Sequence, residues 1–271
     1  MAKVVFQGER GAFSEDAVIN FFGSVDLSPC PSLVDVFDAV SRDIADFGVV
    51  PVENSQAGSI NETYDLLLNH TLNIYGEMAL EVNHCLMALP GESLDSIKKV
   101  YSHPQALAQC AQFLDKLEVE LVPTYDTAGS AKLIKEKGLT NSAAVASKKA
   151  SEIYVMHVLA ENIQTIPGNY TKFFVISKEE AGYTDRNKTS LVFVTKNIPG
   201  ALYHCMGCFA IRNINLTKLE SRPSKDKPWD YIFYVDFDGR AEDEICAQAL
   251  ADLEEKTSFL KILGSYPKNV E

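Results

Sequence analysis

The sequence predicts an α/β protein in which two α/β lobes are followed by a smaller domain with βαββαβ order. Three observations lead to this prediction. Short apolar runs alternate with segments of helical periodicity up to residue 181, as in a parallel sheet. Two long extended stretches, 72–89 and 170–177, interrupt this alternation and are expected to cross between the lobes. After a charged linker at 178–188, the order of elements changes.

The first lobe is predicted to contain strands at 4–6, 26–30 and 47–50 and helices at 13–22, 33–40 and 60–68. Ser32 and Asn61 stand where helix N-caps are expected. The second lobe repeats the rhythm, with strands at 99–101, 120–122 and 143–146 and helices at 104–114, 126–137 and 147–152. Because ligands bind at the carboxyl ends of strands in open α/β sheets, we expect a cleft where the two lobes face each other.

The last part has strands at 190–195, 215–220, 231–237 and 259–263 and helices at 200–209 and 243–253, with the two middle strands joined as a hairpin by a polar loop. This order is the ferredoxin-like plan. Its exposed sheet edge favours pairing with a second copy, so a dimer through this domain is expected. The expected boundaries are 1–181, with lobes at about 1–80 plus 160–181 and about 81–159, and 188–268.

Composition and charge restrict the class of partner. The chain has 271 residues, 46% of them apolar and 23% charged, which is ordinary for a folded protein. A formal net charge of −12 argues against a nucleic-acid partner. No apolar run approaches the roughly 20 residues that span a bilayer, and the first residues do not form a secretory signal. We therefore expect a cytoplasmic protein with no membrane partner.

Six cysteines are scattered along the chain, and only Cys205 and Cys208 are close in sequence. The pair lacks the second pair of a zinc knuckle and the strand–helix setting of a redox motif. Two small apolar side chains at positions i and i+3 of a helix are the favoured interpretation. The sequence predicts no metal site.

Polar clusters stand where predicted strands lead into helices or loops. They comprise a glycine-containing turn at 8–14, the loop at 51–55, the helix start at 102–105, and N-cap positions before the helices near 127 and 147. The second crossing stretch is also interrupted by polar groups. In a strand, Asn169, Thr171 and Phe173 point to one side while Tyr170 and Lys172 point to the other. Pattern alone thus predicts a cleft of hydroxyls, amides, one His and one Lys.

These blocks, taken in order, resemble the prephenate dehydratase family. The resemblance rests on Pro51-Val52-Glu53-Asn54-Ser55, on the segment from Ser102-His103-Pro104-Gln105 to Cys110, on Asn169-Tyr170-Thr171-Lys172-Phe173, and on the turn at 8–14. Pro199-Gly200-Ala201-Leu202 and Glu220-Ser221-Arg222-Pro223 resemble the phenylalanine-binding motifs of the family's ACT regulatory domain. Two positions depart from the family pattern: Lys172 replaces an Arg, and Ala12 stands where a Thr is common.

The resemblance implies a two-lobed, periplasmic-binding-protein-like catalytic domain with two crossing strands, followed by a ferredoxin-like ACT domain. It implies that prephenate loses water and carbon dioxide to give phenylpyruvate. Because aromatisation drives this reaction, no cofactor is expected. Thr171 is the expected catalytic residue, as a donor to the departing oxygen. The expected substrate-binding residues are Ser14, Glu53, Asn54, Ser55, Ser102, His103, Gln105, Thr127, Ser147, Asn169 and Phe173.

The resemblance also implies feedback inhibition by L-phenylalanine in a homodimer or a dimer of dimers. The expected effector-binding residues are Gly200, Ala201, Leu202, Asn215, Leu216, Glu220, Ser221, Arg222 and Pro223. Two alternatives remain open at this point. One is an arogenate dehydratase, whose substrate carries an amine in place of the ketone, and the other is a non-enzymatic amino-acid sensor.

Overall fold

A computed structural model describes residues 1–224 and 231–269 of the chain. They form two compact units. Unit 1 comprises Met1–Thr63 and Met78–Phe173, and unit 2 comprises Tyr64–Glu77 and Phe174–Glu271. The chain passes from one unit to the other within single secondary-structure elements.

The first sheet has the strand order β2-β1-β3-β11-β5, with β4 paired to β3. The central pairs β1–β2 and β1–β3 are parallel, as the βα alternation predicts. Its strands are β1 (Lys3–Gln7), β2 (Asp26–Cys30), β3 (Phe47–Asn54), β4 (Gly58–Ser59), β5 (Asn73–Glu81) and β11 (Tyr170–Ser177). The associated helices are α1 (Phe13–Phe22), α2 (Leu33–Ser41) and α3 (Asn61–Asn69).

Helix starts in this lobe follow local capping chemistry. Ser32 caps α2 as predicted, because its side chain accepts a hydrogen bond from Asp35 N while the Asp35 carboxylate accepts one from Ser32 N. Asn61, in contrast, is the first residue of α3 and not the residue before it. The N-cap of α1 is Ala12, which has no side-chain acceptor. The first amides of α1 are therefore left without a side-chain cap.

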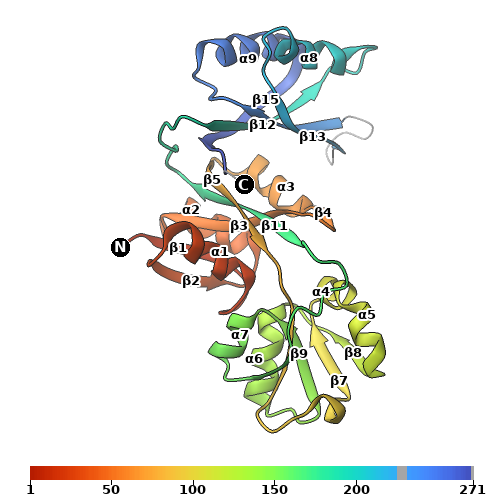
Figure 1. The fold of residues 1–271 in the computed structure, drawn as a ribbon. Coiled ribbons are helices and arrows are strands. Elements are labelled where there is room, and N and C mark those ends of the chain that lie inside the picture. Colours follow the sequence, from red (N-terminus) through yellow and green to blue (C-terminus); the bar gives the residue numbers. More distant parts are fainter. Residues whose placement is uncertain (225–230, 270–271) are drawn as a thin grey trace. The chain divides into compact units, whose positions relative to one another are not determined.

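The second sheet has the order β10-β6-β9-β7-β8. Strand β7 (Lys99–Ser102) pairs parallel with β8 (Glu120–Pro123) and with β9 (Ser142–Ala146). Strand β6 (Cys85–Ala88) pairs antiparallel with β9, and β10 (His157–Ala160) pairs antiparallel with β6. In Figure 1, α6 (Thr127–Lys137) and α7 (Lys148–Ile153) lie on one side of this sheet, and α4 (Pro104–Gln109) and α5 (Ala111–Leu114) lie on the other. Two short 3₁₀ turns, η1 (Leu94–Ser96) and η2 (Asp115–Leu117), complete the lobe.

The chain crosses between these two sheets twice, as predicted. The stretch expected at 72–89 is not one strand, because β5 ends at Glu81 and β6 begins at Cys85. Residues 82–84 leave the first sheet, and their hydrogen bonds go to the returning segment instead: Val82 N donates to Asn169 O at 2.7 Å, and His84 O accepts from Ile163 N at 3.0 Å. The two crossings are thus joined to each other by main-chain bonds. Strand β10, which precedes the return, was not predicted.

The last part of unit 2 has the predicted βαββαβ order. Its elements are β12 (Asn187–Thr195), α8 (Ala201–Ala210), β13 (Leu216–Pro223), β14 (Tyr231–Asp238), α9 (Glu244–Lys256) and β15 (Thr257–Pro267). The sheet is antiparallel in the order β13-β14-β12-β15, which is ferredoxin-like, and both helices cover one face of it (Figure 1). The residues 225–230 of the predicted hairpin loop lie outside the described residues.

Cys205 and Cys208 lie on α8, one turn apart, as the helical interpretation predicts. Both are free thiols buried in the core between the helices and the sheet. Burial raises the pKa of each thiol, so neither is held as a reactive thiolate. They act as small apolar side chains.

The helices of the chain are short or polar. Within 1–224 and 231–269, none is both long enough and apolar enough to cross a bilayer.

Candidate active site

A cavity of about 350 Å³ lies in unit 1, lined by residues of both lobes and of both crossing segments. The structure brings seven of the predicted site residues to its wall. These are Ser14, Asn54, His103, Gln105, Thr127, Thr171 and Phe173. The segments that supply them are far apart in sequence, so the cavity is assembled by the fold.

Thr171 is half-buried on β11 and faces the cavity. Its Oγ1 accepts a hydrogen bond from Asn54 Nδ2 at 3.0 Å. Since a hydroxyl has one proton to donate and can accept at its lone pairs, the Asn54 bond occupies an acceptor position and leaves the Thr171 proton available. The arrangement suits a donor directed at a bound ligand.

Asn54 is itself fixed from both ends of its carboxamide. Its Oδ1 accepts from Gln56 N at 3.1 Å and from Ala57 N at 3.0 Å, in the turn that follows β3. Its Nδ2 also donates to Asn169 Oδ1 at 2.7 Å. These bonds determine which end of the amide faces Thr171. Asn169 is fully buried and does not line the cavity, and its role is to accept this hydrogen bond from Asn54.

Strand alternation separates Lys172 from the cavity. Thr171 and Phe173 are two apart on β11 and both line it, whereas Lys172 between them does not. The Lys at this position therefore does not face the cavity.

Three helix starts reach the cavity wall. His103 caps α4, with its Nδ1 accepting from Gln105 N at 3.2 Å and Pro104 in the first turn. In the neutral ring the proton is then on Nε2, which leaves His103 a donor on its exposed side. Asp126 caps α6 by accepting from Gly129 N at 2.8 Å. Ser14 belongs to the first turn of α1.

Four other predicted residues do not line the cavity, and the hydroxyl groups of three of them bond to the main chain. Ser102 is fully buried and its hydroxyl donates to Val145 O at 2.6 Å. Ser147 is the N-cap of α7 and also donates to Gly11 O at 2.6 Å. Ser55 accepts from Tyr170 N at 2.9 Å, beside the cavity wall. Glu53 lies on β3 opposite Ser59 of β4.

The comparisons with known proteins agree with these blocks. A family model described as prephenate dehydratase matches residues 4–181. The chain belongs to the prephenate dehydratase family. Family membership makes it a dehydratase, that is, a carbon–oxygen lyase.

Several relatives match nearly the whole chain. An Arabidopsis thaliana protein named arogenate dehydratase/prephenate dehydratase 2, chloroplastic, is 44% identical, over 98% of this chain and 72% of its own length. The bifunctional chorismate mutase/prephenate dehydratase of Aquifex aeolicus is 43% identical, over 98% of this chain and 74% of its own.

Solved structures confirm the fold class, including the two periplasmic-binding-protein-like lobes. The prephenate dehydratase of Arthrobacter aurescens, in complex with L-Phe, superposes with a TM-score of 0.88 at 31% identity, covering 98% of this chain and 90% of that one. A quorum-quenching acylase called GqqA superposes with a TM-score of 0.89 at 32% identity, covering 98% of both chains.

In this family member, the cavity wall also contains residues that the sequence analysis did not select. Among them are His84, Gln109, Glu62, Tyr125 and Asp126. Gln109 belongs to the block that begins at Ser102, so its place in the motif was the available signal. His84 stands alone in an apolar extended stretch, where a single His carries no pattern of its own.

The charged side chains of the cavity wall are acidic. Glu62 and Asp126 line it, and no Lys or Arg is among the described residues that do. Burial raises the pKa of Asp126, and hydrogen bonds from the amides of Gly129, Glu9 and Ala128 lower it. Burial is the larger effect, so the pKa of Asp126 lies above its ordinary value. The wall therefore offers an anionic ligand no Lys or Arg side chain among its described residues. No cluster of His, Cys, Asp and Glu that could hold a metal ion occurs in the described part of the chain.

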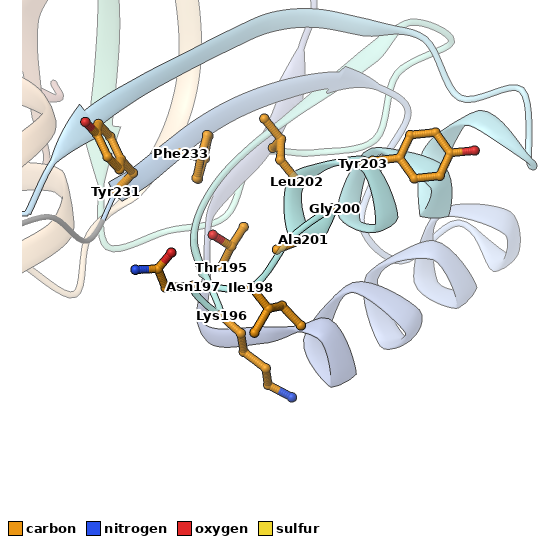
Figure 2. A pocket seen from close by; sticks show the side chains of 10 residues that line it. All are labelled: Thr195, Lys196, Asn197, Ile198, Gly200, Ala201, Leu202, Tyr203, Tyr231 and Phe233. Carbon is orange, nitrogen blue, oxygen red and sulfur yellow. The ribbon is translucent and has the colours of Figure 1, made fainter.

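A second hollow, of about 270 Å³, lies in unit 2 at the start of α8 (Figure 2). Gly200, Ala201 and Leu202 line it, together with Tyr231 and Phe233 of β14. Gly200 has a φ of 77°, a left-handed conformation that suits glycine.

The remaining residues predicted for effector binding lie elsewhere in unit 2. Asn215 donates to Asp238 Oδ2 at 3.0 Å, and Glu220 pairs with Lys218 at 3.0 Å. Arg222 pairs with Asp65 of α3 at 3.1 Å and lies over the ring of Tyr234. Leu216, Ser221 and Pro223 belong to the same strand, β13, and are not among the residues that line the hollow.

Proposed function

We propose that the chain converts prephenate to phenylpyruvate, water and carbon dioxide, a step of phenylalanine biosynthesis. The observation that carries this proposal is the hydrogen-bonded pair Asn54–Thr171 in the wall of the cavity. It supports the role proposed for Thr171, because the hydroxyl proton is left free to point at a ligand.

The reaction breaks two bonds. The ring carbon–oxygen bond breaks as the hydroxyl leaves, and the bond to the ring carboxylate breaks as its electron pair enters the ring. One proton completes the departing water. Thr171 is proposed to donate a hydrogen bond to the departing oxygen and to relay this proton from solvent, since threonine itself does not titrate near neutral pH.

The acidic wall fits the loss of the ring carboxylate. Asp126 and Glu62 line the cavity without a basic side chain among the described lining residues, so a carboxylate near them is poorly stabilised. Its conversion to neutral carbon dioxide relieves this unfavourable interaction. The other predicted substrate-binding residues on the wall include Ser14, Gln105 and His103, whose side chains can donate hydrogen bonds to the carboxylate that remains.

A second candidate substrate is arogenate, and the same acidic wall favours it. Arogenate carries an ammonium group where prephenate has a ketone, and Glu62 and Asp126 can attract that charge. The Arabidopsis relative is named for both activities. The kcat/KM values for the two substrates, measured side by side on one preparation, decide which is preferred.

L-phenylalanine is proposed to inhibit the enzyme through the second domain. The Arthrobacter aurescens structure holds L-Phe. The hollow beside Gly200 is lined by three aromatic residues, Tyr203, Tyr231 and Phe233, and lies at a helix start. We further propose the division into a catalytic domain at 1–181 and an ACT domain at 188–268. A homodimer or dimer of dimers and a cytoplasmic location complete the proposal.

One assay tests the central proposal. Phenylpyruvate formation from prephenate is followed with and without L-phenylalanine. We expect turnover that L-phenylalanine reduces. Binding of L-phenylalanine without turnover of either substrate would instead support the amino-acid sensor and overturn the proposed reaction.

A further inference from the structure

The turn at 8–11 of the first lobe lies against the second lobe. It connects β1 to α1, and the three residues that follow it, Ala12, Phe13 and Ser14, line the cavity. Its partners in the second lobe belong to α6, to α7 and to the residues next to these helices. The contacts that fix this turn therefore also fix one side of the cavity wall.

Two hydroxyl groups of the second lobe bind successive carbonyl groups of this turn. Tyr154 Oη donates to Arg10 O at 2.9 Å, and Ser147 Oγ donates to Gly11 O at 2.6 Å. Burial raises the pKa of Tyr154 to about 12, so its hydroxyl keeps its proton at neutral pH. Ser147 Oγ also accepts from Ala150 N at 3.1 Å, which leaves its single proton for the turn. Both hydroxyl protons are therefore used by the main chain of the first lobe.

Gly11 permits the close approach of the turn to α7. Its φ of 84° lies in the left-handed region, and a Cβ added there would lie 2.8 Å from Ala150 Cα. Glycine avoids both the conformational strain and the clash. The turn therefore packs directly on the main chain of α7, with no side chain between them. Ser147, which begins this contact, is only 2% exposed, so water does not compete for its bond to the turn.

Charged and polar side chains add further contacts between the lobes. Glu9 Oε2 accepts from Lys132 Nζ at 2.9 Å, and Glu9 Oε1 accepts from Tyr125 Oη at 3.2 Å. Lys149 of α7 pairs with Asp16 in the first turn of α1 at 3.2 Å. These side chains are partly exposed, so each pair contributes little by itself. The two hydroxyl–carbonyl bonds are therefore the stronger restraint on the turn.

We propose that Ser147 and Tyr154 are positioning residues, which hold the turn at 8–11 on the second lobe and so keep the cavity in its ligand-binding form. The identity of the ligand rests on the proposed function. Without the two bonds, the turn separates from the second lobe in part of the molecules, and the apparent affinity falls with the fraction that keeps the contact. A saturating ligand restores the contact, so turnover at saturation changes less.

The experiment compares Tyr154→Phe, Ser147→Ala and the double variant with the wild type. The control for Tyr154→Phe is Tyr101→Phe, because Tyr101 is half-buried in the same lobe, does not line the cavity and has no hydrogen bond from its hydroxyl to a described residue. The control for Ser147→Ala is Ser151→Ala, because Ser151 lies on the same helix and donates within it, to Lys148 O at 2.6 Å. The measured quantities are kcat, KM, the calorimetric Kd for phenylpyruvate, and the hydrogen exchange of residues 8–16 without ligand.

We expect each single variant to raise KM and the phenylpyruvate Kd by about three- to tenfold, as for the loss of one hydrogen bond, with kcat changed less than about twofold. The double variant should raise both further. Hydrogen exchange of residues 8–16 should be faster in all three variants. Ser147→Thr keeps the hydroxyl and should stay within about twofold of the wild type. Tyr154→Phe and its control decide the outcome if Ser147→Ala does not fold.

Values of KM, Kd and exchange at 8–16 that match those of the two controls would overturn the proposal. Faster exchange confined to 148–153 in Ser147→Ala would also overturn it for Ser147, since that residue would then serve only its own helix. A fall in kcat with KM unchanged would assign the turn to the chemical step and overturn its role in binding. Since hydrogen exchange needs neither turnover nor ligand, it tests the turn even if the wild type does not convert prephenate, which would count only against the proposed function.

Discussion

Asn54 and Thr171 are 117 residues apart in sequence, yet Asn54 Nδ2 donates to Thr171 Oγ1 at 3.0 Å. The bond ties the end of β3 to the start of β11, where the second crossing re-enters the first sheet. It orients the hydroxyl by occupying one of its acceptor positions.

Thr171→Val removes the hydroxyl at nearly constant shape. We expect kcat to fall about 100-fold or more with a smaller change in KM, because the lost bond strengthens only as the oxygen departs. Thr171→Ser keeps the hydroxyl and should retain turnover to within about tenfold. Steady-state kinetics of the two variants test the role. Equal losses in both would show that shape at this position matters more than the hydroxyl.

Asn54→Asp separates the two functions of the Asn54 amide. The carboxylate can still accept from Gln56 N and Ala57 N, so the turn after β3 is kept. It cannot donate to Thr171, and the hydroxyl is expected to donate to it instead of to the substrate. We expect kcat to fall about 10- to 100-fold, and Tm to fall as well, because Asn169 Oδ1 loses its donor and faces a buried carboxylate. Asn20→Asp, at an exposed position of α1, is the control, and an equal loss there would contradict the prediction.

Gly200→Ala tests the effector hollow. At a φ of 77° an alanine is strained by about 1–2 kcal/mol, and its methyl would lie 3.5 Å from His204 Nε2. We expect inhibition by L-phenylalanine to weaken at least tenfold in concentration, with uninhibited kcat preserved. Gly182→Ala is the matched control, since it has no atom within 4 Å of the added methyl and no positive φ. Unchanged inhibition of Gly200→Ala would argue against binding at this hollow.

Glu15 gives a prediction on pH. Burial raises its pKa, but hydrogen bonds from Arg10 Nε and Gly11 N and the charge of Lys149 together outweigh burial and leave the pKa below its ordinary value. The ionised form therefore stabilises the fold above pH 4.5, and this contribution is lost as pH falls through the lowered native value.

Glu15→Gln should accordingly lower the free energy of unfolding by about 1–3 kcal/mol at pH 7. The difference from the wild type should shrink as pH is lowered below 4.5. Urea unfolding at pH 7, 5, 4 and 3 measures the difference in the free energy of unfolding. Glu152→Gln, at an exposed position of α7, is the control. A difference that stays constant over this range would show that the Glu15 charge is not responsible.

Local signals were sufficient to predict most helices and strands, and strand alternation was sufficient to predict part of the cavity wall. Ser32 caps its helix through a capping box that is visible in the sequence, and the alternation along β11 correctly separated Thr171 from Lys172. Capping also predicted Ser147 as the first residue before α7. The Ser147 hydroxyl accepts a hydrogen bond from Ala150 N and donates one to Gly11 O. No local pattern reveals the bond to Gly11, because that residue lies far away in the sequence.

His84 shows why the rest could not be predicted. Val82 and Cys85, on either side of Asn83-His84, are apolar, and no glycine or proline between β5 and β6 indicates a break. The break arises because the crossing segment bonds to 163–169 instead of to either sheet. A contact between segments about 80 residues apart has no periodicity for a sequence pattern to report.

The amino-acid sequence by itself determined the order of strands and helices, the change of plan after the linker and the residue types available for chemistry, since these follow from periodicity, capping and side-chain type over a few neighbouring positions. Only the tertiary structure decided which polar groups reach the cavity and which are consumed by the main chain. It also decided that Gln109 and His84 join the wall. Those outcomes depend on hydrogen bonds between distant segments, and each donor or acceptor can be used only where the fold brings its partner.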